Sequence, residues 1–436
     1  MASLAHGRWL PSLLLDVVYL KAIYQDLYPS PEGRAMSSSL PAIFLPQRLM
    51  LVAVLCLALS SMGYGRTITL ARDGSGEFSI LQHALDAAAS GDTILVGPGE
   101  YTEMFPVQYP GYPWEVDVAG NITVPELTII GAGPAVTIIG QPTQIIDYSH
   151  YSPLALGWLG GGSCKVEDLT LRNSYDGFQA ADGSVFVENC EFSENVRGLT
   201  WINIGSGGRI TNSTFFTSFL SSDAQLGLYG MGGGAFIENC NFSMATFGIA
   251  IEASRVDDVL IDQCEIYNAR IGIQISAGAG CLINDCQIHD CEFIGVNLTP
   301  VAARCEIRDS EVSGELWAVN VREEGIFFAT NSIFSGGSYG VMKFTNSAPV
   351  YVRYCDLIKG SSAYSIDCVQ FPDYGNIQHD FLGNYWGTGD AGLIASWIHD
   401  IHDDPAILAE VLYTPFYGGP VDTETTSWGD LKALWR

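Results

Sequence analysis

Apolar and polar residues alternate in short runs that recur along most of the chain. The clearest runs read apolar–polar–apolar, as in Cys190–Glu191–Phe192 and Cys240–Asn241–Phe242. Such alternation predicts a short strand with one buried face. The first position of this motif recurs 21 to 27 residues apart, at Leu169, Cys190, Ser213, Cys240, Cys264, Cys286, Ser310, Ser332 and Cys355. A period of this length predicts a repeat fold.

Two further runs accompany each repeat. One follows the first motif and reads "GIAI" at Gly248–Ile251, "GIQI" at Gly272–Ile275 and "GVNL" at Gly295–Leu298. The other precedes it and reads "VFV" at Val185–Val187 and "AFI" at Ala235–Ile237. Three short strands in about 23 residues are typical of one coil of a parallel β-helix. The L-x-x-L-x-L run of leucine-rich repeats is missing.

The two ends of the repeat region resemble those of the right-handed parallel β-helix proteins of the pectate-lyase-like superfold. The matching segments are Glu77–Glu103 near the start and "GNYWGTGD" at Gly383–Asp390 near the end, and the resemblance covers Thr67–Gly418. It implies an all-β, right-handed parallel β-helix of about ten coils. A short N-terminal capping helix would begin at Ser79 and turn Ile80, Ala84, Leu85 and Ala88 inward. The superfold hosts lyases, hydrolases, epimerases, adhesins and scaffolds, so the resemblance assigns no activity.

The segments outside the repeats divide the chain into three parts. Leu49–Leu59 is an apolar run after Arg48, followed by small residues, which is the layout of a signal peptide. We therefore expect residues 1–65 to be an upstream extension plus signal peptide, cleaved near Gly65. Residues 66–418 would form the β-helix, and residues 419–436 a linker with a short amphipathic tail. The mature chain would then be secreted, periplasmic or on the cell surface, with no membrane span.

The net charge of the chain limits the kinds of partner that it is expected to bind. Forty-eight acidic residues against 20 basic ones give a net charge of −28. Such a surface repels nucleic acid, so we expect no nucleic-acid partner. Carboxylate oxygens suit Ca²⁺, so the charge is compatible with a calcium cofactor, although solubility is the favoured explanation of it. We expect a monomer.

The recurring Asn-Cys pair predicts architecture rather than chemistry. Asn189, Asn212, Asn239 and Asn331 each precede the first motif, where the alternation slips and the backbone must bend. Asn tolerates the left-handed conformation, and stacked amides can hydrogen-bond from coil to coil. Cys190, Cys240, Cys264 and Cys286 follow at an inward position and are expected to form a column of free thiols. Disulfides between neighbouring coils remain an alternative, whereas zinc is disfavoured because no C-x-x-C occurs.

Ligand binding is expected on the sheet built from the "GI-x-I" strands. Its outward column is predicted to contain Thr200, Ala250, Gln274, Asn297, Asn320 and Met342, with Glu252 and Arg322 in the next outward column and Lys343 facing inward. Amide, hydroxyl and charged groups in a row suit a hydroxylated chain. The predicted partner is therefore a polysaccharide or surface glycan, bound by Glu252, Gln274, Asn297 and Asn320.

The sequence does not decide whether the protein is an enzyme. The resemblance implies, for a polysaccharide lyase, that Arg322 or Lys343 abstracts a proton while Glu323, Glu324 and Asp367 hold Ca²⁺. The characteristic "WxDH" segment of such lyases is missing. For a glycoside hydrolase, Asp257–Asp258 is the nearest carboxylate pair, but its companion motifs are absent. His399 and His402 stand among aspartates in the closing segment, where a role in the cap is favoured over a metal site. A non-catalytic surface scaffold is the third alternative.

Overall fold

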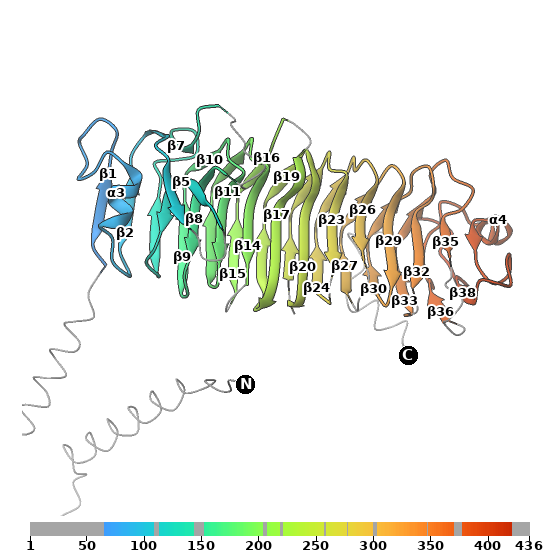
Figure 1. Cartoon of the computed structure of the whole chain (residues 1–436). Helices are drawn as coiled ribbons and strands as arrows, with labels where there is room; N and C mark the ends of the chain where they lie inside the picture. The colour runs from blue at the N-terminus through green and yellow to red at the C-terminus, as the bar shows by residue number, and fades with distance from the viewer. Residues whose placement is uncertain are drawn as a thin grey trace, which may run out of the picture. The chain divides into compact units, whose positions relative to one another are not determined.

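Three parallel sheets wind around one apolar core in the computed structural model of the chain. The structure describes residues 65–108, 113–143, 152–203, 207–218, 221–256, 259–276, 278–299, 303–346, 348–369 and 377–420. The coils stack in one row from β1 (Thr67–Leu70) to α4 (Ala391–Ala395) (Figure 1). The predicted signal peptide and the C-terminal tail lie outside the described residues.

Sheet A has 14 strands in the order β1, β2 (Thr93–Val96), β6 (Leu127–Ile130), β9 (Ser163–Glu167), β12 (Ser184–Glu188), β15 (Gly208–Thr211), β18 (Ala235–Glu238), β21 (Val259–Asp262), β24 (Gly280–Asn284), β27 (Arg304–Arg308), β30 (Ile326–Thr330), β33 (Val350–Arg353), β36 (Ile377–Asp380) and β38 (Ala409–Leu412). Sheet B has 11 strands: β3 (Gly99–Tyr101), β7 (Thr137–Gly140), β10 (Thr170–Arg172), β13 (Glu191–Ser193), β16 (Thr214–Phe216), β19 (Asn241–Ser243), β22 (Glu265–Tyr267), β25 (Gln287–His289), β28 (Glu311–Ser313), β31 (Ile333–Ser335) and β34 (Asp356–Ile358).

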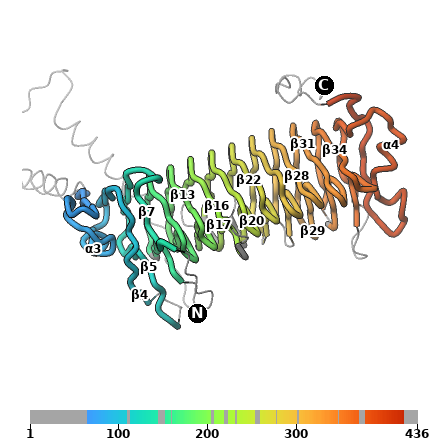
Figure 2. The backbone as a smooth tube through the Cα atoms, turned by 90° about the horizontal axis from the view of Figure 1, so that it is seen from above, coloured from blue at the N-terminus to red at the C-terminus, as the bar shows by residue number. Residues whose placement is uncertain are grey.

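Sheet C has 13 strands in the order β4 (Phe105–Gln108), β5 (Glu115–Ile122), β8 (Leu154–Leu159), β11 (Asp176–Ala181), β14 (Arg197–Ile202), β17 (Ser221–Gly232), β20 (Ala245–Val256), β23 (Ile271–Ser276), β26 (Ile294–Leu298), β29 (Trp317–Glu323), β32 (Met342–Asn346), β35 (Ile366–Cys368) and β37 (Ile398–His399). In the described part of the chain, the sheet pairs are parallel except β4–β5, which is antiparallel and extends away from the stack (Figure 2).

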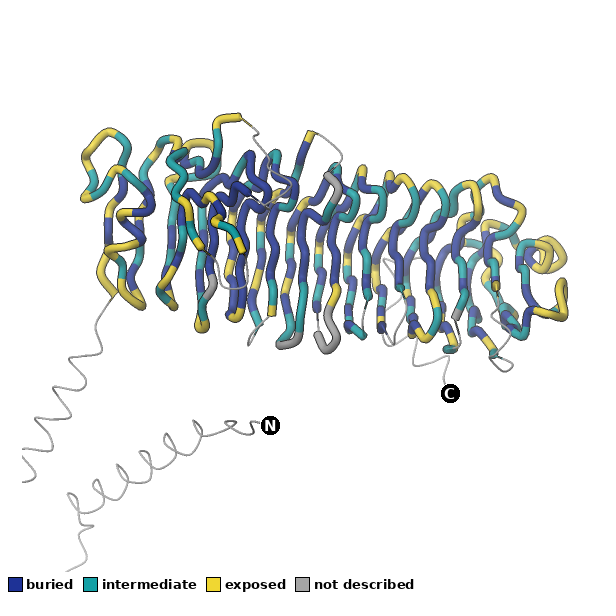
Figure 3. The backbone as a smooth tube through the Cα atoms, in the orientation of Figure 1, coloured by how far each residue is buried: buried dark blue, intermediate teal, exposed yellow. Residues whose placement is uncertain are grey.

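The predicted all-β solenoid is confirmed, and it has more coils than the ten or so that the repeat motif indicated. The first coils of sheet A, built from β1, β2 and β6, lack that motif, so a count of motifs misses them. Buried and exposed positions alternate along the strands (Figure 3). The inward column of sheet B is fully buried, and Phe192, Phe215 and Phe242 stack there with ring centroids 4.4 and 4.7 Å apart.

A short helix closes the N-terminal end, but not with the predicted residues. Helix α3 (Leu81–Asp86) begins after Ile80, which has extended backbone and makes no side-chain cap bond, so the prediction of a Ser79 cap is wrong. The buried residues follow the helical spacing from Leu81 to Ala84 and Leu85. The helix packs on β5, where a Cβ at Gly120 would come within 2.9 Å of Leu81. None of the described helices is long and apolar enough to span a lipid bilayer.

The bend between sheets A and B is where the Asn-Cys pair lies. Asn189, Asn212, Asn239 and Asn331 have φ between 50 and 52°. Asn239 Nδ2 donates to Asn212 Oδ1 at 2.6 Å, Asn189 donates to Asp168, and Asn331 donates to Asp309. These bonds join coils in pairs.

The cysteine that follows each bend braces it from inside. Cys190, Cys240, Cys264 and Cys286 each donate from Sγ to the backbone carbonyl two residues earlier, at 3.1 to 3.4 Å. Ser213 makes the same bond through Oγ at 2.8 Å and also accepts from the Cys190 N–H at 3.1 Å. All ten cysteines among the described residues are buried and free. Burial raises the pKa of the Cys190 thiol to about 12, so it stays protonated.

Candidate functional site

One outward column of sheet C carries most of the residues that the sequence singles out. The strand register places twelve residues in line: Asn121, Gly157, Gln179, Thr200, Gly227, Ala250, Gln274, Asn297, Asn320, Lys343, Asp367 and His399. The residues on either side of Gln274, Asn297 and Asn320 along each strand are fully buried, so this column faces outward. Neighbouring members lie about 4.8 Å apart along the stack.

The prediction for Met342 and Lys343 is wrong. Lys343 pairs with Asn320 in the outward column, whereas Met342 pairs with Val319 and is buried. The prediction aligns "GVMK" at Gly340–Lys343 with "GIQI" at Gly272–Ile275. The turn before β32 is one residue longer than this alignment requires, so Val341 takes the place of the glycine. Lys343 therefore has the solvent-facing position that is usual for lysine.

Three of the predicted ligand-binding residues bond to one another. Asn320 Nδ2 donates to Asn297 Oδ1 at 2.7 Å, and Asn297 Nδ2 donates to Gln274 Oε1 at 2.7 Å. Gln274 Nε2 donates to Thr299 Oγ1 at 2.8 Å. Asn297 is only 6% exposed and Asn320 9%, because each amide is covered by its neighbours. We call this row of bonded side chains the amide ladder. Its side chains are held rigidly, and most of their hydrogen-bonding groups are already paired with one another or with Thr299.

The remaining predicted residues do not converge. Glu252 and Arg322 are both exposed in the next outward column, three strands apart, which is roughly 14 Å. Glu323 has φ 53° and ends β29, so Glu323 and Glu324 lie in the turn beyond the face. Across the described residues, no three or more His, Cys, Asp or Glu side chains gather closely enough to hold a metal ion. Glu323 and Glu324 belong to no such cluster, and Asp257–Asp258 lie outside the described residues.

A cluster of polar and aromatic side chains lies at the C-terminal end of the column, and we call it the C-terminal patch. Lys343, Asp367 and His399 lie on adjacent strands, and His399 Nδ1 is 2.8 Å from Asp367 Oδ1. The Tyr364 ring stacks on His399 at 4.8 Å. Lys343 Nζ lies 5.8 Å from the centre of the Trp317 ring, on which Tyr339 stacks at 6.1 Å.

Sequence reasoning named Lys343, Asp367 and His399 for separate roles and missed the aromatic residues Trp317, Tyr339 and Tyr364. His399 was assigned to the closing segment, yet it belongs to the sheet C column. His402 lies apart from it, 3.5 Å from Glu410, so the two histidines do not face one site. The cap role belongs to Asp400, which accepts from the N–H groups of His402 and Val411 at 2.9 Å. Counting one coil onward from Lys343 would have placed Asp367 beside it, but the interval to His399 is irregular.

A buried ion pair occupies the N-terminal part of the same face. Arg197 donates to both Asp176 oxygens, at 2.6 and 2.7 Å, and Thr200 Oγ1 donates to Asp176 Oδ1 at 2.7 Å. The Asp176 side chain is 0% exposed. Burial raises the pKa of the Asp176 carboxyl, while Arg197 and Thr200 oppose that rise. The Arg197 guanidinium also lies over the Tyr175 ring at 4.7 Å, so its charge is balanced by contacts within the sheet. The Asp176–Arg197 pair therefore stabilises sheet C.

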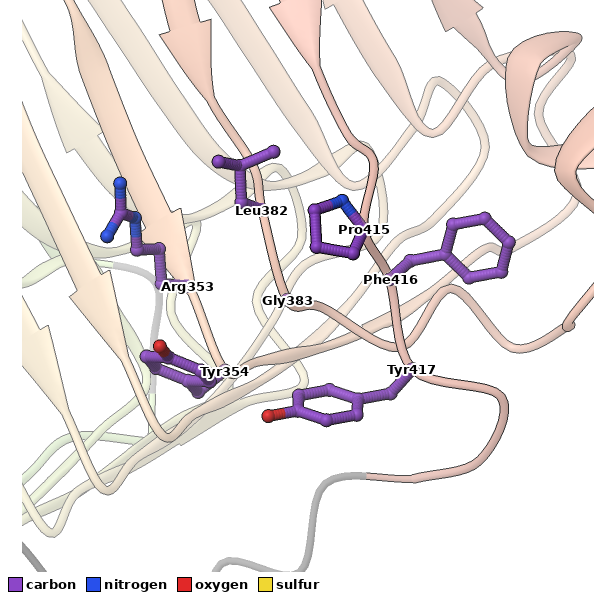
Figure 4. Close-up of a pocket in the computed structure, with 7 residues that line it drawn as sticks. All are labelled: Arg353, Tyr354, Leu382, Gly383, Pro415, Phe416 and Tyr417. Carbon is purple, nitrogen blue, oxygen red and sulfur yellow. The ribbon is translucent and has the colours of Figure 1, made fainter. Parts of the chain in front are cut away.

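A hollow of about 480 Å³ lies away from sheet C, at the end of the closing segment (Figure 4). Its lining includes Tyr354, Pro415 and Tyr417, with the two tyrosine rings 6.3 Å apart. Its one charged lining residue, Arg353, is paired with Asp380. The hollow thus belongs to the cap rather than to the sheet C face.

Comparison with known proteins agrees with this architecture. A family model described as the right-handed β-helix region matches residues 155–312. The chain thus has the fold of a right-handed parallel β-helix. No curated protein matches it in sequence.

Solved structures resemble this β-helix only distantly. The A-module of a mannuronan C-5 epimerase from Azotobacter vinelandii has a TM-score of 0.48 and 13% identity, covering 78% of this chain and 95% of its own. The catalytic unit of an α-1,3-glucanase from Streptomyces thermodiastaticus has a TM-score of 0.43 and 12% identity, covering 91% and 73%. A pectate lyase has a TM-score of 0.38 and 15% identity, covering 82% and 79%.

Proposed function

We propose that this β-helix binds a polysaccharide along the outward face of sheet C and has no catalytic set of its own there. The observation that supports this most is the C-terminal patch, where aromatic rings, a lysine and an Asp–His pair surround the end of the amide ladder. Aromatic rings stack on the apolar faces of sugars, and nearby polar groups bond hydroxyls. Tyr339 is 60% exposed and is therefore available for such stacking.

The shape of the face favours a long ligand over a small one. The column runs along the stack from β5 to β37 without a break in register, which suits an extended chain. Within the described residues, neither Arg322 nor Lys343 has a carboxylate partner. These two cations would offset part of the net charge of −28 where a polar or acidic polymer approaches. Export of the chain, which the sequence predicts, would bring it to such polymers.

The test is a binding survey of the full chain on a glycan array and on soluble polymers, including polygalacturonate and alginate. We expect retention of at least one polymer. Tyr339→Ala should weaken that binding about tenfold, the equivalent of losing one stacking contact of about 1.4 kcal/mol. Lys343→Ala should weaken it to a similar degree. Ile358→Ala removes an exposed apolar side chain from sheet B and should leave the binding unchanged.

A calcium-dependent uronate lyase is the main alternative, because Arg322 and Lys343 lie on adjacent strands of the same face. The same polymers are therefore incubated with and without a chelator while the absorbance of unsaturated product is followed. Calcium-dependent product that disappears in Arg322→Ala or Lys343→Ala would overturn the non-catalytic proposal. A blank array would instead favour a scaffold that binds no glycan.

A further inference from the structure

The outward face of sheet A carries a stripe of aromatic and aliphatic side chains that the proposed function does not use. The register places nine residues in line from β9 to β33: Lys165, Phe186, Arg209, Phe236, Leu260, Leu282, Glu306, Phe328 and Tyr351. We call this line the sheet A stripe. Phe236 is 50% exposed and Phe186 38%, which is unusual for phenylalanine. Six of the nine side chains are aromatic or aliphatic and at least partly exposed, with Arg209 and Glu306 between them, and such a cluster of exposed apolar groups indicates a binding surface.

The stripe is hollowed around Phe236. One hollow of about 640 Å³ is lined by Phe236, Leu260, Leu282 and Arg304, among others. A second of about 370 Å³ lies against Arg209, Phe236, Leu260 and Asp262. The two share Phe236 and Leu260, so they form one shallow groove along the stack. Each has a volume typical of a ligand site, which is about 300–1,000 Å³.

The charges beside the stripe are already paired. Lys165 contacts Glu167 and lies 3.6 Å from Glu188, Arg209 pairs with Glu238, and Arg308 pairs with Glu306. Arg304 lies over the Phe328 ring at 5.4 Å. An acidic sugar would meet few unpaired cations here, whereas the paired groups can still exchange hydrogen bonds with hydroxyls. The surface therefore fits a neutral ligand better than an anionic one.

The spacing of the rings points to a polymer. Phe186 and Phe236 lie two coils apart, on either side of the Arg209 strand, which separates them by about 10 Å. In a β-1,4-linked glycan such as cellulose or chitin every second sugar presents the same face, so a disaccharide unit spans a similar length. Further along the stripe, beyond Leu260, Leu282 and Glu306, Phe328 and Tyr351 lie one coil apart with their rings stacked at 5.1 Å.

We propose that the sheet A stripe is a second glycan-binding face, which takes a neutral β-linked polysaccharide chain lying along the solenoid axis. Phe186 and Phe236 are the stacking platforms, and Arg209, Glu238 and Asp262 line the polar side. This face is independent of the sheet C face, because the two lie on different sheets and share none of these side chains.

The experiment compares the full chain with the double variant Phe186→Ala/Phe236→Ala on insoluble cellulose, on chitin and on soluble hydroxyethyl cellulose. The wild type should be retained by at least one of these. The double variant should bind it about tenfold or more weakly, while a Phe186→Tyr/Phe236→Tyr variant keeps the rings and the binding. Ile358→Ala is the matched control for loss of an exposed apolar group, and thermal unfolding checks that each variant is folded.

Two measurements separate this proposal from the one for sheet C. Tyr339→Ala should leave cellulose or chitin binding unchanged, and the double phenylalanine variant should leave any polymer held by sheet C unchanged. Failure of the wild type to bind any neutral β-linked glycan would overturn the proposal, as would equal binding by the double variant. Sedimentation that shows a dimer converted to a monomer by the double variant would also overturn it, since the stripe would then bury a second copy.

Discussion

Sheets A and C share every coil in the middle of the solenoid, yet they present unlike faces to the solvent. On sheet C, amide side chains bond from coil to coil, and Arg322 and Lys343 lack carboxylate partners among the described residues. On sheet A, charged side chains pair with close neighbours and leave aromatic rings exposed. Sheet A pairs without register shifts in these coils, whereas β17 and β20 of sheet C pair with two. The chemical difference between the two faces nevertheless comes from their outward side chains, which is how one superfold carries many functions.

The largest expected effect is on stability and concerns the Asp176–Arg197 pair. It tests whether the N-terminal part of sheet C serves to stabilise the fold. Asp176→Ala removes the buried carboxylate that accepts two hydrogen bonds from the Arg197 guanidinium, and breaking such a pair costs about 3–5 kcal/mol. We expect the urea midpoint of unfolding to fall accordingly. Asp223→Ala is the control, because Asp223 lies 3.8 Å from Arg197 and is partly exposed, so its loss should cost less than about 1 kcal/mol. An Asp176→Ala protein as stable as the wild type would show that the pair does not brace the sheet.

The next largest effect on stability concerns a buried histidine on the inner side of sheet A. His379 is inward-facing on β36, accepts from the Val350 N–H at 3.2 Å through Nδ1, and is held neutral because burial lowers its pKa to about 4. In the unfolded chain the pKa is about 6.5. Between these two values the unfolded state binds the proton and the folded state does not. Stability should therefore fall by up to about 3 kcal/mol as the pH drops from roughly 6.5 to 4.

His379→Gln keeps a hydrogen-bond acceptor but cannot titrate, so its stability should depend less on pH in this window. The measurement is the free energy of unfolding of both proteins at pH 7 and pH 4. His402→Gln, which alters an exposed histidine, should retain the wild-type dependence. If His379→Gln shows the same loss on acidification as the wild type, other groups beneath the sheets govern acid unfolding.

The sequence allowed the shared framework of the two faces to be predicted well. Periodicity located the strands of sheet B, the bends at the asparagines and the inward cysteines, because each depends on local alternation and on backbone conformation. These are constraints that every coil must satisfy. The position of the capping helix in the chain was predicted correctly, although its buried face begins at Leu81 and not at Ile80.

The differences between the faces were harder to predict, since they depend on register. One extra residue in the turn before β32 exchanged the roles of Met342 and Lys343. Asp176 and Arg197 meet because neighbouring strands place them side by side, and neither belongs to a recurring motif. His399 follows a coil of irregular length, so counting residues does not place it in the column. In the sheet A stripe, phenylalanine alternates with arginine, and no repeat motif distinguishes this pattern from that of an ordinary surface.

The smallest effect concerns the bend that joins sheet A to sheet B. Asn239 has φ 52° and donates to Asn212, so Asn239→Ala should cost about 1–2 kcal/mol, mainly because alanine resists the left-handed conformation. Asn239→Gly accepts that conformation and loses only the exposed amide bond, which should cost less than about 1 kcal/mol. Thermal unfolding of the two variants measures the difference. Glycan binding at Phe236 and at Tyr339 should be unchanged in Asn239→Gly, because the bend is retained. Equal destabilisation by alanine and glycine would mean that the amide bond, and not the backbone conformation, is what the asparagine supplies at this bend.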